Sequence, residues 1–170
     1  MLPILGKFLI FFGLSALGFQ HAHGLKRRAS CLRDVLGALE RLERELGFAL
    51  LPVETLLKQM KEGSRGAARE FFHQCQTRFQ SRGEERLEEI WTETLQESTL
   101  PLTEEDKRLV QEVGGIMGRY DGDSQRQAFA RIHDRLKMQQ EEAAEEAARM
   151  GKVYSVLGPS IGLILALLLG

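Results

Sequence analysis

The chain has 170 residues, enough for one domain with a modest core. Its 23 Lys and Arg residues nearly balance its 24 Asp and Glu residues, so the net charge of −1 gives no reason to expect nucleic acid as a partner. The two cysteines, Cys31 and Cys75, are too few and too far apart for a disulfide framework or a zinc knuckle. Except for Lys7, every charged residue lies between Lys26 and Lys152, so a charged middle region separates two apolar ends.

The first residues predict a membrane anchor. Residues 8–19 read FLIFFGLSALGF, which is the length of a signal-peptide apolar core. The preceding MLPILG is apolar too, however, and no small-x-small cleavage site follows. We therefore expect residues 1–20 to form an uncleaved transmembrane anchor in which Lys7 snorkels to the interface. A cleaved signal peptide is the alternative.

Residues 25–152 are expected to form an all-α bundle of about six helices. Apolar residues spaced by three and four between Leu32 and Leu50 predict the first helix, which Pro52 ends. A short second helix follows from Val53 to Met60. The sequence shows no alternating run of useful length that would indicate a strand.

The next three helices are predicted from their apolar residues and their start signals. Ser64 is expected to cap the third helix. Thr103, followed by Glu104, Glu105 and Asp106, predicts the start of the fifth, which should run to about residue 119. The apolar residues of the third and fourth helices are Ala68, Phe71, Phe72, Cys75 and Phe79, then Leu87, Ile90, Trp91 and Leu95.

A glycine-rich stretch, GGIMGRYDGDSQRQ at residues 114–127, is the main candidate for chemistry. No glycine in it precedes Lys-Ser or Lys-Thr, as a P-loop requires, and no G-x-G-x-x-G follows a strand. Read as a calcium loop from Asp121, it places Arg126 at the sixth position and Ile132 at the twelfth, where glycine and glutamate are needed.

The same stretch suits a joint between two helices. Gly114 and Gly118 lie four residues apart on one helix face, where another element can pack closely. A glycine at the helix end can adopt positive φ, and Asp121 or Asp123 can accept backbone N–H bonds at the next helix start. Ser124 with Gln127 offers a capping box there.

The last helix has no strong break before Gly151 and could continue into the C-terminal segment. Residues 153–170, VYSVLGPSIGLILALLLG, carry no charge and are expected to form a transmembrane helix, kinked at Pro159. The cations that flank the two anchors are Lys26, Arg27, Arg28, Arg149 and Lys152. By the positive-inside rule they place the middle region in the cytoplasm and both termini on the opposite side.

Other candidate chemistry is sparse. His21 and His23 form a lone H-x-H, and no serine lies in G-x-S-x-G. We expect no enzymatic activity, no cofactor, no metal and no small-molecule substrate. A membrane-tethered metal-binding sensor using His21, His23 and Cys31 is an alternative.

Four segments in order resemble the stage III sporulation protein AB family of endospore-forming bacteria. They are LRDVLGALERLERELGFALLPVETLLKQM, REFFHQCQTRF with EEIWTETLQE, the glycine-rich stretch, and KVYSVLGPSIGLILALLLG. In the glycine-rich stretch, Gly118, Asp121 and Gln125 match the family signature. The resemblance covers essentially the whole chain, although Lys7, Pro159 and Ser160 interrupt its anchors.

The resemblance implies a bundle similar to the cytoplasmic domain of the type II secretion platform protein F. It also implies a structural role in the channel-like complex between mother cell and forespore, with the protein in the mother-cell membrane. The implied partners are the ATPase of that complex, stage III sporulation protein AA, its other membrane subunits and the lipid bilayer. A platform protein of a type II secretion or type IV pilus-like system is the alternative.

Charged helix faces are the candidate surfaces for docking the ATPase. One face carries Arg126, Arg131 and Arg135, and another carries Glu85 and Glu89. Each of these residues also suits a merely solvated surface.

Overall fold

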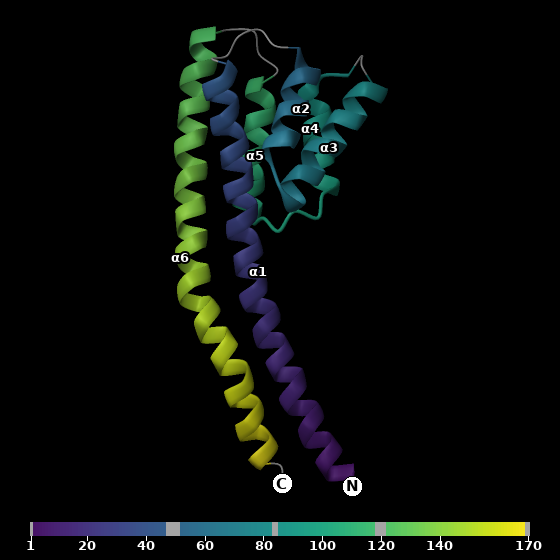
Figure 1. Ribbon diagram of the computed structural model, residues 1–170, viewed down its shortest axis with the longest axis vertical. Helices are drawn as coiled ribbons and strands as arrows, with labels where there is room; N and C mark the ends of the chain where they lie inside the picture. Colours follow the sequence, from purple (N-terminus) through teal and green to yellow (C-terminus); the bar gives the residue numbers. More distant parts are fainter. Residues whose placement is uncertain (1, 47–51, 83–84, 118–121, 169–170) are drawn as a thin grey trace. The chain divides into compact units, whose positions relative to one another are not determined.

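The computed structural model describes residues 2–46, 52–82, 85–117 and 122–168, all in helices or short connections (Figure 1). Within the helices, the side chains of residues 2–5, 7, 8, 10, 14, 42–46, 122–126 and 166–168 are not described. The helices are α1 (Leu2–Leu46), α2 (Val53–Gly63), α3 (Gly66–Ser81), α4 (Leu87–Glu97), α5 (Glu104–Met117) and α6 (Gly122–Leu168). The described residues contain no strand, which confirms the all-α prediction.

Two long helices run through both ends of the chain, α1 unexpectedly and α6 as its lack of a strong break before Gly151 allowed. α1 runs continuously through residues 20–24, QHAHG, because a single interior glycine costs a helix only about 1 kcal/mol. α6 continues through Pro159 to Leu168. The chain divides into two compact units: unit 1 is Met1–Ala29 with Glu141–Gly170, and unit 2 is Ser30–Gln140.

The core of unit 2 is built around Trp91. Its ring lies 5.0 Å from that of Phe71 and 5.8 Å from that of Phe72, measured between centroids. All three side chains are buried, and the indole Nε1–H donates a hydrogen bond of 2.8 Å to the Val110 carbonyl. Gly114 is the residue of α5 that makes room for this ring, since a Cβ there would lie 2.5 Å from Cγ of Trp91.

The predicted start of α5 is confirmed as a capping box. The Thr103 N–H donates to Oδ2 of Asp106 at 2.9 Å, and the Asp106 N–H donates to Oγ1 of Thr103 at 3.2 Å. Asp106 is fully buried, so the first of these bonds also provides a donor to a carboxylate taken out of water.

The predicted role of Ser64 was wrong. Its hydroxyl donates to the Met60 carbonyl at 2.8 Å, so Ser64 closes α2 rather than opening α3. α3 begins at Gly66, whose φ of +52° is strained for any residue with a Cβ. Ser124 also does not cap α6, because that helix already begins at Gly122.

Unit 1 is an antiparallel pair formed by the first part of α1 and the last part of α6. A Cβ on Gly18 would lie 2.5 Å from the backbone oxygen of Tyr154, and one on Gly162 would lie 3.1 Å from the backbone of Phe11. Small residues fill the contact between the helices: Ser15, Gly18, Ala22 and Ala29 on α1, and Ala143, Ala147, Gly151 and Gly162 on α6 are all buried. The two backbones therefore approach closely.

Within the described residues, no helix offers a stretch long and apolar enough to cross a membrane. The transmembrane helices expected at residues 1–20 and 153–170 thus gain no support from this finding. Several residues of both expected spans lie outside those whose side chains are described.

Candidate functional site

A groove on unit 2 brings together two of the expected docking residues. Arg131 and Arg135 of α6 line it with Glu88 of α4 and with Arg108 and Glu112 of α5, and its volume is about 600 Å³. We call it the arginine groove. Arg135 is paired with Glu112, with 3.2 Å between Nη1 and Oε2.

The arginine groove is amphipathic. Ile116 and Ile132 contribute an apolar part of its lining and are themselves buried. Gly115 adds no side chain to the lining of the groove. A Cβ there would meet only the Glu88 carboxylate, at 3.4 Å from Oε1. Three arginines against two glutamates leave this surface cationic, so it can bind a segment that carries carboxylates beside apolar side chains.

The predicted acidic residues lie elsewhere. Glu85 is 3.5 Å from Arg82, which also pairs with Glu93 at 2.9 Å. The hydrogen bond that Arg82 donates to Glu93 is the main reason why the pKa of Arg82 is raised. Glu89 lines a separate shallow groove with Arg86 and Glu93. Glu85 and Glu89 therefore do not join the arginines in one site.

The rest of the glycine-rich signature is only partly visible. Gly114 packs against Trp91, as described above, and α5 ends at Met117. Gly118 and Asp121 lie outside the described residues. Asp123, Gln125 and Arg126 lie in the first turns of α6, where side chains are not described.

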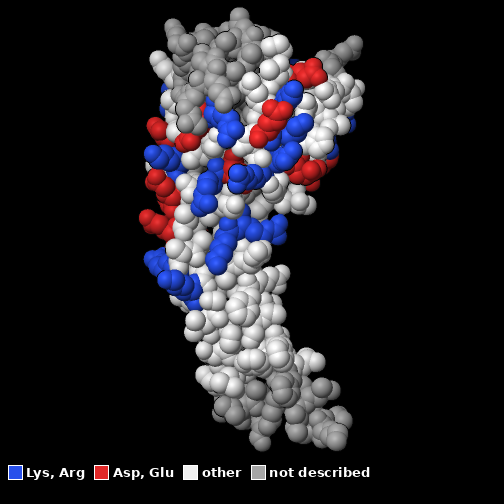
Figure 2. Space-filling model, viewed as in Figure 1, with Lys and Arg blue, Asp and Glu red and all other residues white. Residues whose placement is uncertain are grey.

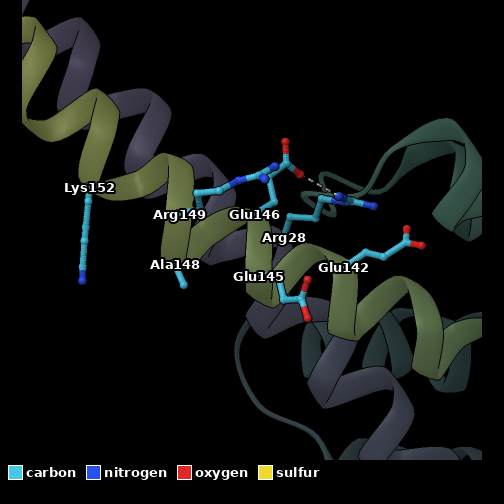
Figure 3. A pocket seen from close by; sticks show the side chains of 7 residues that line it. All are labelled: Arg28, Glu142, Glu145, Glu146, Ala148, Arg149 and Lys152. Carbon is cyan, nitrogen blue, oxygen red and sulfur yellow. Dashed lines mark hydrogen bonds and ion pairs between the residues drawn. The ribbon is translucent and has the colours of Figure 1, made fainter.

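The flanking cations gather in unit 1, next to its uncharged part. On the face shown in Figure 2, blue Lys and Arg side chains border a region without red or blue among the described atoms. Arg28 pairs with Glu146, with 3.3 Å between Nη1 and Oε2. Figure 3 shows that pair in a charged pocket of about 820 Å³, where Lys152 extends away from the glutamates. The pocket is lined by Arg28, Glu142, Glu145, Glu146, Ala148, Arg149 and Lys152.

The histidines and cysteines assemble no reactive centre in the part of the chain that the structure describes. There, no group of three or more His, Cys, Asp or Glu residues could hold a metal ion. Burial raises the pKa of the Cys75 thiol to about 12, which makes it a poor nucleophile near neutral pH. His133 contacts Glu40 at 3.4 Å and Asp134 at 3.7 Å, a surface ion pair when the ring is protonated.

Sequence reasoning missed how unit 1 is packed. Its large apolar side chains point outward, with Leu9 74%, Val156 63% and Phe12 62% exposed, while small residues fill the contact. Small residues repeating every three or four positions on both helices, as in Ala143, Ala147 and Gly151, were the signal.

These observations define a class of protein: an all-α helical bundle continuous with an apolar, closely packed helix pair, bearing charged grooves suited to binding. The chain matches the family described as stage III sporulation protein AB over residues 3–170. It is 25% identical to stage III sporulation protein AB of Bacillus subtilis (strain 168) over 171 aligned residues, which cover 99% of each chain. No solved structure matches it.

The chain therefore belongs to the stage III sporulation protein AB family, and this membership supports a role in sporulation.

Proposed function

We propose that the chain is a membrane-anchored structural platform of the sporulation complex between mother cell and forespore. Unit 1 holds it in the mother-cell membrane, and unit 2 lies in the cytoplasm and docks the ATPase of the same complex. The protein performs no chemistry itself.

The packing of unit 1 carries the proposal of an anchor. In water, a helix pair buries its large apolar side chains and exposes its small ones, because burial of apolar area drives the association. Unit 1 does the reverse. Helices in lipid pack through small residues, because the surrounding hydrocarbon is as apolar as leucine and close backbone approach gives the attraction. An exposed apolar surface of this kind needs a membrane or a partner to cover it.

The arginine groove supports the docking part. Arg131 and Arg135 belong to the long helix α6, so a partner bound there is held by an element continuous with the anchor. Exposed cations next to buried Ile116 and Ile132 provide attraction for carboxylates together with apolar contact.

Carbonate extraction of membranes from sporulating cells tests the anchor. A platform anchored by unit 1 stays in the membrane pellet at high pH and dissolves only in detergent. Release into the carbonate supernatant would reject the anchor.

Affinity purification in mild detergent tests docking. Reversing Arg131 and Arg135 to glutamate should abolish recovery of the ATPase while the other membrane subunits remain. The matched control reverses the exposed Lys58 and Arg69 of unit 2, away from the groove. Equal recovery of the ATPase with both double variants would reject the arginine groove as the docking surface.

A further inference from the structure

Unit 1 has a second groove, which differs in charge from the pocket in Figure 3. It lies along α1 and α6, has a volume of about 790 Å³, and we call it the lysine groove. Its cations are Lys26 from α1 and Lys152 from α6, and none of the residues that line it is acidic. Phe19, Ala16 and Ala147 supply apolar surface.

A buried glycine of α6 lies where Lys26 of α1 approaches that helix. Gly151 is buried, and a Cβ on it would meet Cε of Lys26 at 4.0 Å. Cε of Lys26 therefore lies near Gly151 of α6, and Lys152, the next residue of α6, lines the same groove. Both lysines are exposed, and neither forms an ion pair with any residue that the structure describes.

The apolar part of the groove extends away from the lysines along α1. Ala16 precedes Lys26 by ten residues, which is about 15 Å along a helix. That length equals about half of a hydrocarbon core of about 30 Å, the depth that one leaflet occupies. A molecule with an anionic end and one long apolar chain fits this arrangement of charge and length.

We propose that the lysine groove binds one anionic phospholipid, whose phosphate lies between Lys26 and Lys152 and whose acyl chain follows Ala16 and Phe19. The inference rests on the proposed anchoring of unit 1 in a membrane and adds a lipid selectivity to it. Cations at the membrane surface attract anionic headgroups by about 1 kcal/mol each. A zwitterionic lipid gains little there, because its own ammonium group opposes the two lysines.

Native mass spectrometry of the full-length chain in non-ionic detergent tests the selectivity. Phosphatidylglycerol and phosphatidylcholine of identical acyl chains are titrated, and the lipid adducts are counted. The wild type should retain one phosphatidylglycerol at concentrations about tenfold or more below those needed for phosphatidylcholine, as two cations imply. The Lys26→Gln, Lys152→Gln double variant should lose that preference.

Two further variants separate the site from net charge and from misfolding. Lys58→Gln with Lys137→Gln removes the same charge from exposed positions in unit 2 and should keep the preference. Lys26→Arg with Lys152→Arg keeps the cations and should keep it too. Loss of preference in the unit 2 variant, or equal binding of both lipids by the wild type, would overturn the inference.

Two controls separate the possible failures. Glycerol 3-phosphate at millimolar concentration should not displace the lipid; displacement would mean that the site binds a phosphate without its chain, which overturns the assignment. Incorporation of the chain into pure phosphatidylcholine vesicles is measured by flotation. If the chain does not float with the vesicles, both the membrane anchor and the lipid site are rejected. If it floats but binds both lipids equally, only the lipid site is rejected.

Discussion

Replacing Gly114 by alanine should destabilise the chain, although alanine is ordinarily the better helix residue. The added Cβ would lie 2.5 Å from Cγ and 2.6 Å from Cδ1 of Trp91, well inside van der Waals contact. Trp91 has little freedom to retreat, because its ring is buried against Phe71 and Phe72 and its Nε1–H is bonded to Val110.

The expected size follows from these contacts. Overpacking a core costs about 1–3 kcal/mol, and disturbing a buried hydrogen bond adds about 1 kcal/mol. The intrinsic helix preference of alanine returns about 1 kcal/mol. The net loss of about 1–3 kcal/mol lowers the Tm of a chain of this size by roughly 2–12 °C.

Tryptophan fluorescence reads this effect directly, because the chain has a single Trp. The full-length protein in detergent is heated while the emission of Trp91 is followed. Gly115→Ala is the control, since its Cβ meets only Glu88, at 3.4 Å, and the variant should melt at or slightly above the wild-type Tm. A Gly114→Ala protein with unchanged emission and an unchanged or higher Tm would refute the reasoning.

Three more outcomes are expected. Asp106→Ala should lower the free energy of unfolding by about 1–2 kcal/mol, because the α5 capping box is lost. The control Glu105→Ala, at an exposed position, should change it little. Equal effects of the two variants in chemical denaturation would contradict the cap. Gly18→Val should speed amide hydrogen exchange in residues 11–22 at least several-fold, because its side chain meets the backbone of α6 and overpacking costs about 1–3 kcal/mol. Gly13→Val, whose Cβ has open space, should leave the exchange rate unchanged. Mass spectrometry of the exchanged peptides measures both. In a Cys31→Ala chain, Cys75 should react with a thiol reagent at pH 8 about a thousand times more slowly when folded than when unfolded, because burial raises its pKa from 9.0 to about 12. Since the folded state keeps a proton that the unfolded state releases above about pH 9, the free energy of unfolding should also fall as pH rises from about 9 to 12.

The elements of unit 2 were largely predictable because each is encoded locally. Leu87, Ile90, Trp91 and Leu95 mark the buried face of α4 by their spacing, and Thr103 with Asp106 marks the start of α5. The same local reasoning failed at Ser64, where a hydroxyl satisfies the end of the preceding helix as readily as the start of the next. α3 begins two residues later, at Gly66, which takes positive φ.

The sites were less predictable because they depend on elements distant in sequence. The arginine groove combines Arg108 with Arg131 and Arg135, and helix periodicity cannot say that α5 and α6 lie together. Helix periodicity also could not predict that Glu89 lies apart from those arginines. The lysine groove combines Lys26 with Gly151 and Lys152. Lys26 and Gly151 lie 125 positions apart, and only the antiparallel pairing of α1 with α6 brings them close.

The burial pattern changes in the same sense along both long helices. On α1 the buried residues are Ser15, Gly18, Ala22 and Ala29 in unit 1, and Cys31, Leu32, Val35, Leu36, Ala38 and Leu39 in unit 2. On α6 they are Phe129, Ile132 and Leu136 in unit 2, and Ala143, Ala147 and Gly151 in unit 1. Large buried side chains are the pattern that water imposes, and small buried side chains with large exposed ones are the pattern that hydrocarbon permits.

Cationic residues lie within the part of each helix that packs through small residues: Lys26 to Arg28 on α1, and Arg149 and Lys152 on α6. Cations that border an uncharged helix pair are what an interface between water and lipid produces. This arrangement on two helices motivates our proposal that the membrane surface lies at Lys26 and Lys152. It also explains why an anionic lipid is the ligand that we expect there.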